Sequence, residues 1–167
     1  MKPYTFAAAA LLAFAAPLSA AALTDADILR EARDRAEIAE LGWNYVRAID
    51  TMNEDAYVRV FTPDGSFNAV TGSAALSKMV TDLKQSRADR VAKGEPPQPA
   101  MHHIVTNEYI QFVDRDHARV NYYWMTVFAG TPTTQPPRVA AAGRGLDEVV
   151  RVNGKWLIQT RNVAPKD

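Results

Sequence analysis

The chain has 167 residues, of which 19 are Lys or Arg, 19 are Asp or Glu and none is Cys. Because the charges cancel and form neither a basic stripe nor a block of one sign, the composition argues against nucleic acid as a partner and favours a small, neutral or weakly charged ligand. The lack of cysteine excludes disulfides, thiol catalysis and thiolate metal sites, so stability must come from packing.

The first residues have the features of a secretory signal peptide. Lys2 precedes an apolar run over residues 6–16, and small residues follow at 19–22. The run is too short for a membrane span and ends in a pattern typical of a cleavage site, so we expect residues 1–22 to be removed; the alternative is a retained membrane anchor. Residues 23–167 would then form a single exported domain, periplasmic or secreted, with one core and no membrane span.

Helical patterns dominate the next part of the chain. Thr24 is a suitable N-cap, and apolar residues at spacings of three and four predict a helix from there to about residue 49. Further elements are expected as a short helix over 53–61, a turn over 62–65, a strand over 66–70 and a helix over about 74–92.

The pattern changes from helical to extended after a proline-rich loop at 94–99. Four strands are expected, over about 101–113, 117–129, 138–152 and 155–163, with Asn153 and Gly154 as a strong hairpin signal. Helices first and a meander of long strands later indicate an α+β domain, in which one curved antiparallel sheet wraps around the helices on its concave face.

Two of the three histidines, His102 and His103, are adjacent at the start of the first long strand. Neighbouring strand residues point to opposite faces, so at most one of them faces a given pocket and the two cannot act as a pair. Imidazole suits general-base work, and a nearby carboxylate would fix its tautomer. The alternative for each is a histidine on the surface, or a core histidine whose ring nitrogens are hydrogen-bonded to other core groups. The third, His117, lies at a turn and is expected to be solvated.

Asp50 is the candidate carboxylate, because it lies at the end of the first predicted helix. The negative end of the helix dipole disfavours an acid there by about 0.3–1 kcal/mol if it is exposed. Another group must therefore hold Asp50 in place. The alternative is that Asp50 caps the following turn through its neighbours at 51–53.

Several segments, in this order, carry a resemblance to a known family. They are residues 37–41 (EIAEL), 45–50 (YVRAID), 61–65 (FTPDG), 103–107 (HIVTN) and 154–158 (GKWLI), together with Asp147 and Arg161. The chain resembles the SnoaL-like branch of the NTF2-like superfamily over nearly all of residues 23–167, which implies an NTF2-like cone. That superfamily contains scytalone dehydratase, hexachlorocyclohexane dehydrochlorinase, polyketide cyclases, ketosteroid isomerase and formaldehyde lyases, beside members without catalysis, so the fold alone does not choose a function.

The resemblance implies a set of catalytic residues. Asp50 and His103 match the Asp and His that form a dyad inside the cone of the eliminating enzymes, and Tyr45 and Arg161 match two further pocket positions. His103 would take a proton from carbon while Asp50 orients its ring, and Tyr45 or Arg161 would stabilise the developing negative charge or the leaving group. The alternatives are a core aromatic for Tyr45 and an exposed strand arginine for Arg161.

An apolar pocket beside these residues would suit a small hydrophobic or aromatic compound. Its expected lining residues are Trp43, Phe61, Tyr122, Trp124 and Phe128. Gly145 stands where relatives often carry an aromatic residue, and the gap is expected to widen the cavity. No cofactor or metal is expected, because the adjacent histidines face apart and no spaced ligand motif accompanies them.

Together these features predict a cofactor-independent lyase, such as a dehydratase or a related elimination enzyme, or else an isomerase, acting on a small hydrophobic, hydroxylated compound. The alternative is a non-catalytic small-molecule-binding or interaction protein of the same fold. Relatives also imply a homodimer or homotrimer, the dimer forming through the outer face of the sheet.

Overall fold

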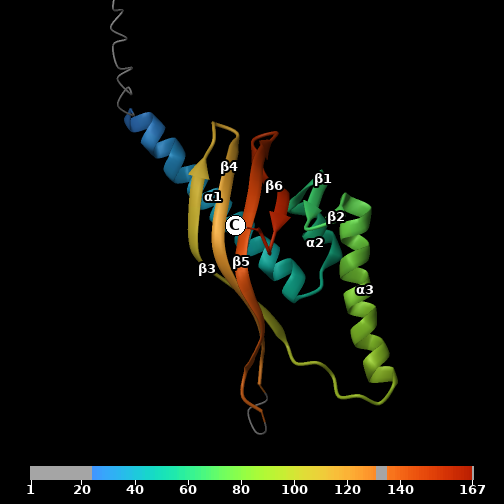
Figure 1. Ribbon diagram of the computed structural model, residues 1–167. Helices are drawn as coiled ribbons and strands as arrows, with labels where there is room; N and C mark the ends of the chain where they lie inside the picture. The colour runs from blue at the N-terminus through green and yellow to red at the C-terminus, as the bar shows by residue number, and fades with distance from the viewer. Residues whose placement is uncertain (1–23, 131–134, 167) are drawn as a thin grey trace, which may run out of the picture.

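A computed structural model of the protein describes residues 24–130 and 135–166. The predicted signal peptide, residues 1–22, lies outside this range. The elements follow in the order α1 (Asp25–Asp50), α2 (Glu54–Arg59), β1 (Phe61–Phe67), β2 (Val70–Thr71), α3 (Ser73–Ala92), β3 (Met101–Phe112), β4 (His117–Phe128), β5 (Arg138–Val152) and β6 (Lys155–Asn162) (Figure 1). Each long helix and strand lies where the sequence predicts it. None of the helices within the described range is long and apolar enough to cross a membrane.

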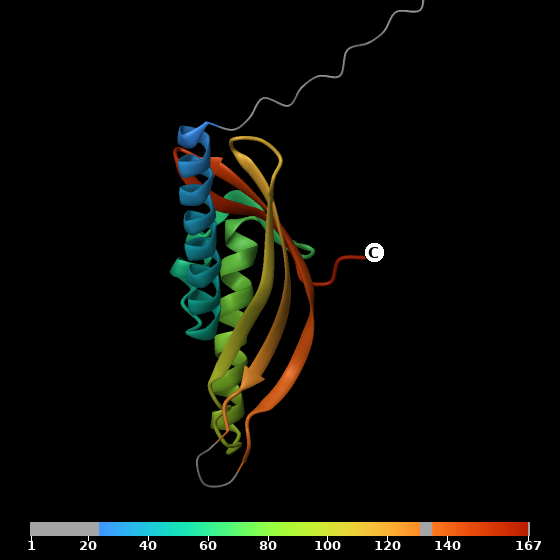
Figure 2. The same ribbon diagram turned by 90° about the vertical axis from the view of Figure 1, so that its left-hand side faces the viewer.

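The six strands form one curved, open sheet in the order β2-β1-β6-β5-β4-β3. Neighbouring strands are antiparallel except for β1 and β6, which pair in parallel. Figure 2 shows α1 and α3 on the same, concave side of the sheet. The predicted α+β fold, with helices on the concave face of one curved sheet, is confirmed.

Local chemistry fixes both ends of α1. At its start the Thr24 side chain accepts a hydrogen bond from the Asp27 backbone N–H, and the Asp27 side chain binds the Thr24 N–H in return. At its end Met52 adopts a left-handed conformation with φ 51°, and the Asn53 N–H donates to the Ala48 carbonyl at 2.9 Å. The chain therefore turns sharply directly after Asp50, which leaves this carboxylate at the end of the helix that faces β3.

The inner face of α3 packs against the sheet side of the molecule. Leu76 and Val80 are fully buried there, and Leu83 is half-buried in the core. The same spacing of three and four residues continues to Arg87 and Arg90, which are also half-buried.

The predicted turn over residues 62–65 is wrong, because these residues belong to β1. They lie beside β6, where Phe61 pairs with Ile158. A side chain at Gly65 would lie 2.9 Å from the Ile158 carbonyl oxygen, so the glycine permits the close approach of the two strands. Long-range pairing with β6 therefore outweighs the local turn preference of this segment.

Candidate active site

Asp50 and His103, which we call the dyad, meet where the end of α1 lies against β3. His103 Nδ1 is 2.7 Å from Asp50 Oδ1, and the His103 backbone N–H donates to the two carboxylate oxygens at 3.1 and 3.2 Å. The Asp50 side chain is 8% exposed and the His103 side chain 20% exposed. The hydrogen bond expected between these residues is thus present, in a largely desolvated place.

Asp50 does not cap the turn that follows it. The Thr51 hydroxyl donates to the Arg47 carbonyl, and the Asn53 side chain caps α2 by accepting from the Ala56 N–H. The hydrogen bonds of Asp50 go to His103 instead. These bonds offset the unfavourable position of a carboxylate at the negative end of a helix.

The dyad fixes which nitrogen of His103 can act as a base. Because Asp50 accepts from Nδ1, the neutral ring carries its proton on Nδ1 and the lone pair on Nε2. Among the residues that the structure describes, Nε2 has no hydrogen-bond partner. His102 points to the other face and is exposed, and His117 is exposed and bound to Asp114. His103 is the histidine that faces the interior.

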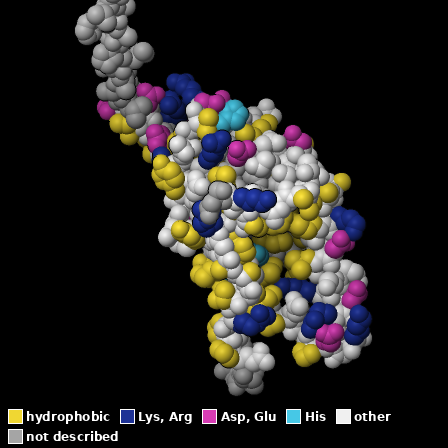
Figure 3. Space-filling view, viewed as in Figure 1, with side chains coloured by type: hydrophobic (Ala, Val, Ile, Leu, Met, Phe, Trp, Pro, Cys, Tyr) yellow, Lys and Arg dark blue, Asp and Glu magenta, His cyan; other side chains and the backbone are white. Residues whose placement is uncertain are grey.

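Apolar side chains surround His103 on the concave face. Strand alternation places Met101 and Val105 on the same face of β3 as His103. On β4, Trp124 and Phe128 lie on that face, two residues either side of Thr126, the cross-strand partner of His103. Figure 3 shows a hollow between the sheet and α3 whose walls carry hydrophobic side chains. Two of the predicted lining residues, Trp124 and Phe128, therefore lie beside the dyad.

Asp147 and Arg161, which we call the arginine pair, form a second charged cluster deeper in the core. Arg161 Nη1 donates to one oxygen of Asp147, and the Tyr122 hydroxyl donates to the other at 2.8 Å. The guanidinium carbon lies 3.8 Å from the ring centre of Tyr45 and 4.7 Å from that of Tyr122. The side chains of Arg161 and Asp147 are 5% and 7% exposed, so this cluster is sealed.

Burial dominates the electrostatics of the arginine pair. It raises the pKa of Asp147 to about 6, although the Arg161 guanidinium acts in the opposite direction. Burial opposes the charge of Arg161, but Asp147 and the surrounding tyrosines outweigh it and raise the Arg161 pKa. Burial likewise raises the pKa of Tyr45. These groups therefore keep their protons at neutral pH, apart from Asp147.

The predicted contact of Tyr45 and Arg161 with a reacting compound does not fit this arrangement. The cavity beside the arginine pair has a volume of about 20 Å³, enough for about one water molecule. Tyr45 also lies five residues before Asp50 along α1, about 7.5 Å at 1.5 Å per residue. Tyr45 is a core aromatic, as the alternative proposed, whereas Arg161 is neither an exposed arginine nor a wall of an open pocket.

Three residues predicted to bind substrate lie elsewhere. Trp43 is 64% exposed, on the outer face of α1. Phe61 is buried and packs on the rings of Tyr45 and Tyr57, with ring centres 6.0 and 5.2 Å away. Tyr122 is held by Asp147 in the core. All three were predicted to line a pocket because they are aromatic. Their positions along the helix or strand instead place Trp43 in solvent and Phe61 and Tyr122 in the core.

The ring of Tyr122 occupies the space next to Gly145. A Cβ atom built at Gly145 would lie 2.1 Å from Cζ of the Tyr122 ring. The prediction that this glycine widens the substrate cavity is wrong, because the ring of its cross-strand neighbour fills the gap.

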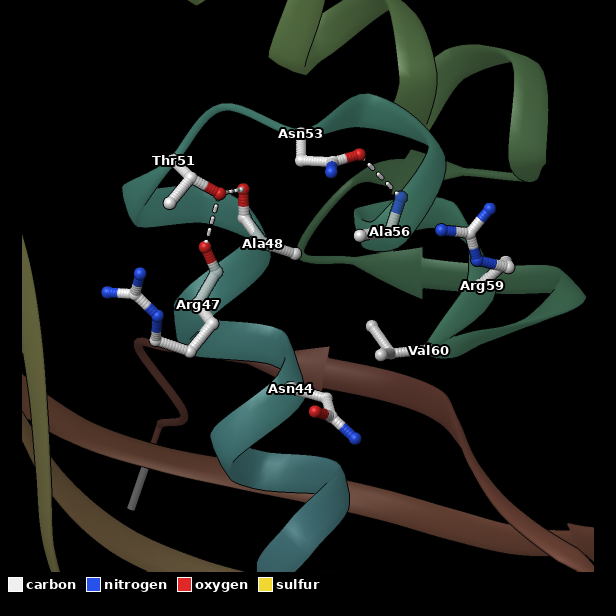
Figure 4. Close-up of a pocket in the computed structure, with 8 residues that line it drawn as sticks. All are labelled: Asn44, Arg47, Ala48, Thr51, Asn53, Ala56, Arg59 and Val60. Carbon is white, nitrogen blue, oxygen red and sulfur yellow. Dashed lines mark hydrogen bonds between the residues drawn. The ribbon is translucent and has the colours of Figure 1, made fainter.

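A pocket of about 440 Å³, which neither residue of the dyad lines, lies where the end of α1 meets α2. Figure 4 shows Arg47 and Arg59 at opposite ends of it, with Ala48 and Val60 between them. Its polar groups do not converge on one point, and it contains no acid beside a base. Within the described residues, no group of three His, Cys, Asp or Glu side chains is placed to hold a metal ion.

Residues 30–162 match the SnoaL-like domain. The chain belongs to the SnoaL-like family. No curated protein matches the sequence of this SnoaL-like protein.

Solved structures show the same fold at low sequence identity. An NTF2-like protein with a cystatin-like fold from Novosphingobium aromaticivorans is 20% identical, with 85% of this chain and 88% of that chain covered and a TM-score of 0.66. A candidate scytalone dehydratase from the same organism is 18% identical, with 81% and 85% covered and a TM-score of 0.64. A Catenulispora acidiphila protein, solved in complex with S-DNPA, is 18% identical, with 78% and 91% covered and a TM-score of 0.62. The NTF2-like fold expected from the resemblance is confirmed.

Two features of this SnoaL-like protein are not among those predicted from its sequence. Asp147 is the partner that neutralises Arg161, and only the register of β5 against β6 brings the two together. Arg87 and Arg90 continue the inner face of α3 toward the hollow. Their signal was available, because they keep the helical spacing of Leu83 and Val80.

Proposed function

We propose that this SnoaL-like protein is a cofactor-independent lyase, in which His103 removes a proton from carbon by general-base catalysis. The observation that carries the proposal is the 2.7 Å hydrogen bond between Asp50 and His103 Nδ1, which leaves Nε2 unbonded on the face of the apolar hollow. Dehydration of a hydroxylated compound is the first choice, and an isomerisation would begin with the same proton transfer.

The elimination can be written with all atoms accounted for. His103 Nε2 takes the proton of an acidic C–H bond, and the electron pair of that bond forms a carbon–carbon double bond. The C–O bond on the neighbouring carbon breaks, and its electron pair leaves with the oxygen. The imidazolium then returns its proton to that oxygen, so that water leaves and neutral His103 is restored.

Asp50 supports this step as the orienting and charge-stabilising partner. Its negative charge lies against the ring that becomes a cation, and its low exposure strengthens that attraction compared with bulk water. The half-buried Val105, Trp124 and Phe128 limit the access of solvent to the same face. A dry, fixed carboxylate costs no rearrangement when the proton moves.

The test uses the two adjacent histidines as a matched pair. Hydroxylated aromatic and polycyclic compounds are incubated with the protein in D₂O, and mass spectrometry follows both loss of water and deuterium uptake at carbon. His103→Ala should lower turnover by about 10²–10⁴-fold, the usual contribution of a general base. His102→Ala, which removes the exposed neighbour, should keep wild-type turnover.

Two results would contradict the proposal. One is a His103→Ala protein that stays folded and keeps its turnover. The other is a panel in which compounds bind but none loses water or exchanges a proton, which would favour the alternative, a non-catalytic binding protein of the same fold.

Location and assembly belong to the same proposal. The signal-like residues 1–22 support export to the periplasm or the medium. The convex face of the sheet exposes Ile104, Tyr123 and Val139 on three neighbouring strands, which supports a homodimer through this face. Light scattering on the purified mature protein should give the mass of a dimer, and a monomer at all concentrations would contradict this assembly.

A further inference from the structure

The inner face of α3 changes from apolar to cationic along its length. Leu76 and Val80 are fully buried and Leu83 is half-buried, but the next two positions on this face are Arg87 and Arg90. A helix that packs on a core normally continues its inner face with apolar residues. Two arginines in this place therefore need a reason beyond packing.

Arg87 is the cation whose charge has no partner. Its Nη2 lies 3.8 Å from the sulfur of Met101, a weak acceptor, and its Nε is buried without a hydrogen-bond partner. No carboxylate pairs with it among the described residues. The Nε of Arg90 is also buried and unbonded, but the other end of that guanidinium pairs with Glu95.

From α3, Arg87 contacts β3 close to the dyad. Its contact residue Met101 is two positions before His103. The side chains of Met101 and His103 therefore share the inner face of β3, about 7 Å apart. The cross-strand partner of Met101 is Phe128, which belongs to the same apolar surface. The uncompensated cation and the proposed base thus lie one row of side chains apart.

A further cation, Arg138, lies on the sheet beside this apolar surface. The guanidinium carbon of Arg138 lies 5.1 Å from the ring centre of Phe128, and Phe128, Arg90 and Arg138 line a pocket of about 430 Å³. Figure 3 shows Lys and Arg side chains at the lower end of the hollow between the sheet and α3. The apolar surface beside the dyad is therefore bordered by positive charge.

We propose that the dyad site takes a hydrophobic carboxylic acid, whose carboxylate is bound by Arg87 while its acidic C–H bond lies at His103 Nε2. This inference rests on the proposed function, because it names the class of compound that the same site receives. A guanidinium binds a carboxylate through two parallel N–H donors, and the guanidinium of Arg87 has no carboxylate partner among the described residues.

The spacing also limits the shape of the acid. Arg87 contacts Met101, one step of about 7 Å along β3 from His103, so an aromatic ring or a short chain fits between the carboxylate and the reacting carbon. Phe128 and Trp124 offer apolar surface to that middle part. Arg138 adds positive charge near the carboxylate end and would attract the acid over an uncharged analogue.

The test measures binding, so that it does not depend on turnover. Three matched pairs of probes are titrated by calorimetry: phenylacetate and 2-phenylethanol, cinnamate and cinnamyl alcohol, 2-naphthoate and 2-naphthylmethanol. The wild-type protein should bind at least one acid about tenfold or more tightly than its alcohol, the gain expected from a hydrogen-bonded charge. Arg87→Gln should remove that preference and leave the affinity for the alcohol unchanged.

A neighbouring cation serves as the control. Lys84 lies on the same helix with an exposed side chain, and Lys84→Gln removes the same charge without reaching the hollow. It should keep the preference for the acid. The ring signals of His103 in NMR spectra should shift on binding of the acid, which places the probe at the dyad.

The outcomes separate this inference from the proposed function. Equal affinity for acid and alcohol in all three pairs, no binding of any acid, an equal effect of Lys84→Gln, or binding that leaves the His103 signals unmoved would each overturn the role of Arg87. None of these results bears on whether His103→Ala lowers turnover. Conversely, a preference for acids that depends on Arg87 would stand even if no compound were converted.

Discussion

Two of the aspartates with buried side chains among the described residues, Asp50 and Asp147, differ in the nitrogen base that each pairs with, in the dyad and in the arginine pair. Both carboxylates are nearly sealed from solvent, and both accept short hydrogen bonds. The bases differ. The imidazole of His103 can gain and lose a proton and has a free nitrogen, whereas the guanidinium of Arg161 stays protonated and lies among tyrosine rings. The burial of an acid thus does not by itself favour a catalytic role, whereas a partner with an exchangeable proton and an unbonded nitrogen does.

The largest expected effect is on stability, in the arginine pair. Arg161→Met would keep much of the packing against Tyr45 and Tyr122 but leave the Asp147 carboxylate buried without its cation. Breaking one side of such a pair typically costs about 3–5 kcal/mol, which urea unfolding at pH 7 would measure. The double variant with Asp147→Asn should recover a large part of the loss. A loss below about 1 kcal/mol would mean that the pair does not hold the core together.

The pH dependence of stability gives a second measure of the same pair. The pKa of Asp147 is about 6 in the folded protein against 3.8 for a free side chain, so between these values the folded state holds a proton that the unfolded state has lost. Its stabilising contribution is present below about pH 4 and is lost as the pH rises through about 6, at about 1.4 kcal/mol per pH unit.

Unfolding curves of the wild type and of Asp147→Asn isolate this contribution. As the pH falls from 7 to 4, the wild type should gain stability over the variant, by up to about 3 kcal/mol, because only the wild type binds the proton. Parallel curves over this range would show that burial does not raise the Asp147 pKa.

The smallest expected effect is that of replacing Trp43, which the sequence assigned to the pocket together with Trp124. Trp43→Ala should change the free energy of unfolding by no more than about 0.5 kcal/mol and leave ligand affinity unchanged, because its ring is exposed on the outer face of α1. Trp124→Ala should weaken binding of the aromatic acid that binds most tightly. Equal effects of the two substitutions on affinity would place the ligand outside the hollow.

The fold could be predicted from sequence because long amphipathic elements carry strong periodic signals. The bounds of α1, α3 and the strands β3 to β6 follow from spacings of three and four or of two. The segment of β1 was misread, since its pairing with β6 is a contact between the two halves of the chain that no local pattern encodes.

The candidate site could be predicted only in part, for a related reason. Asp50 stood out because an acid at the end of a helix needs a partner, and the structure supplies His103. The surroundings of Arg161 and Gly145 depend on the register of β5 against β4 and β6, which brings Asp147 to one and the ring of Tyr122 to the other. Arg87 was overlooked because only its apolar neighbours were used to define the helix.

The most direct measurement is the ¹⁵N NMR signature of the His103 ring in the mature protein at neutral pH. We expect the proton on Nδ1 and a lone pair on Nε2 in the wild type, and a loss of this single tautomer in Asp50→Asn, with His102 unaffected in both. A His103 ring that carries its proton on Nε2, or that averages between the two tautomers in the wild type, would contradict the claim that Asp50 holds a base ready to take a proton from carbon.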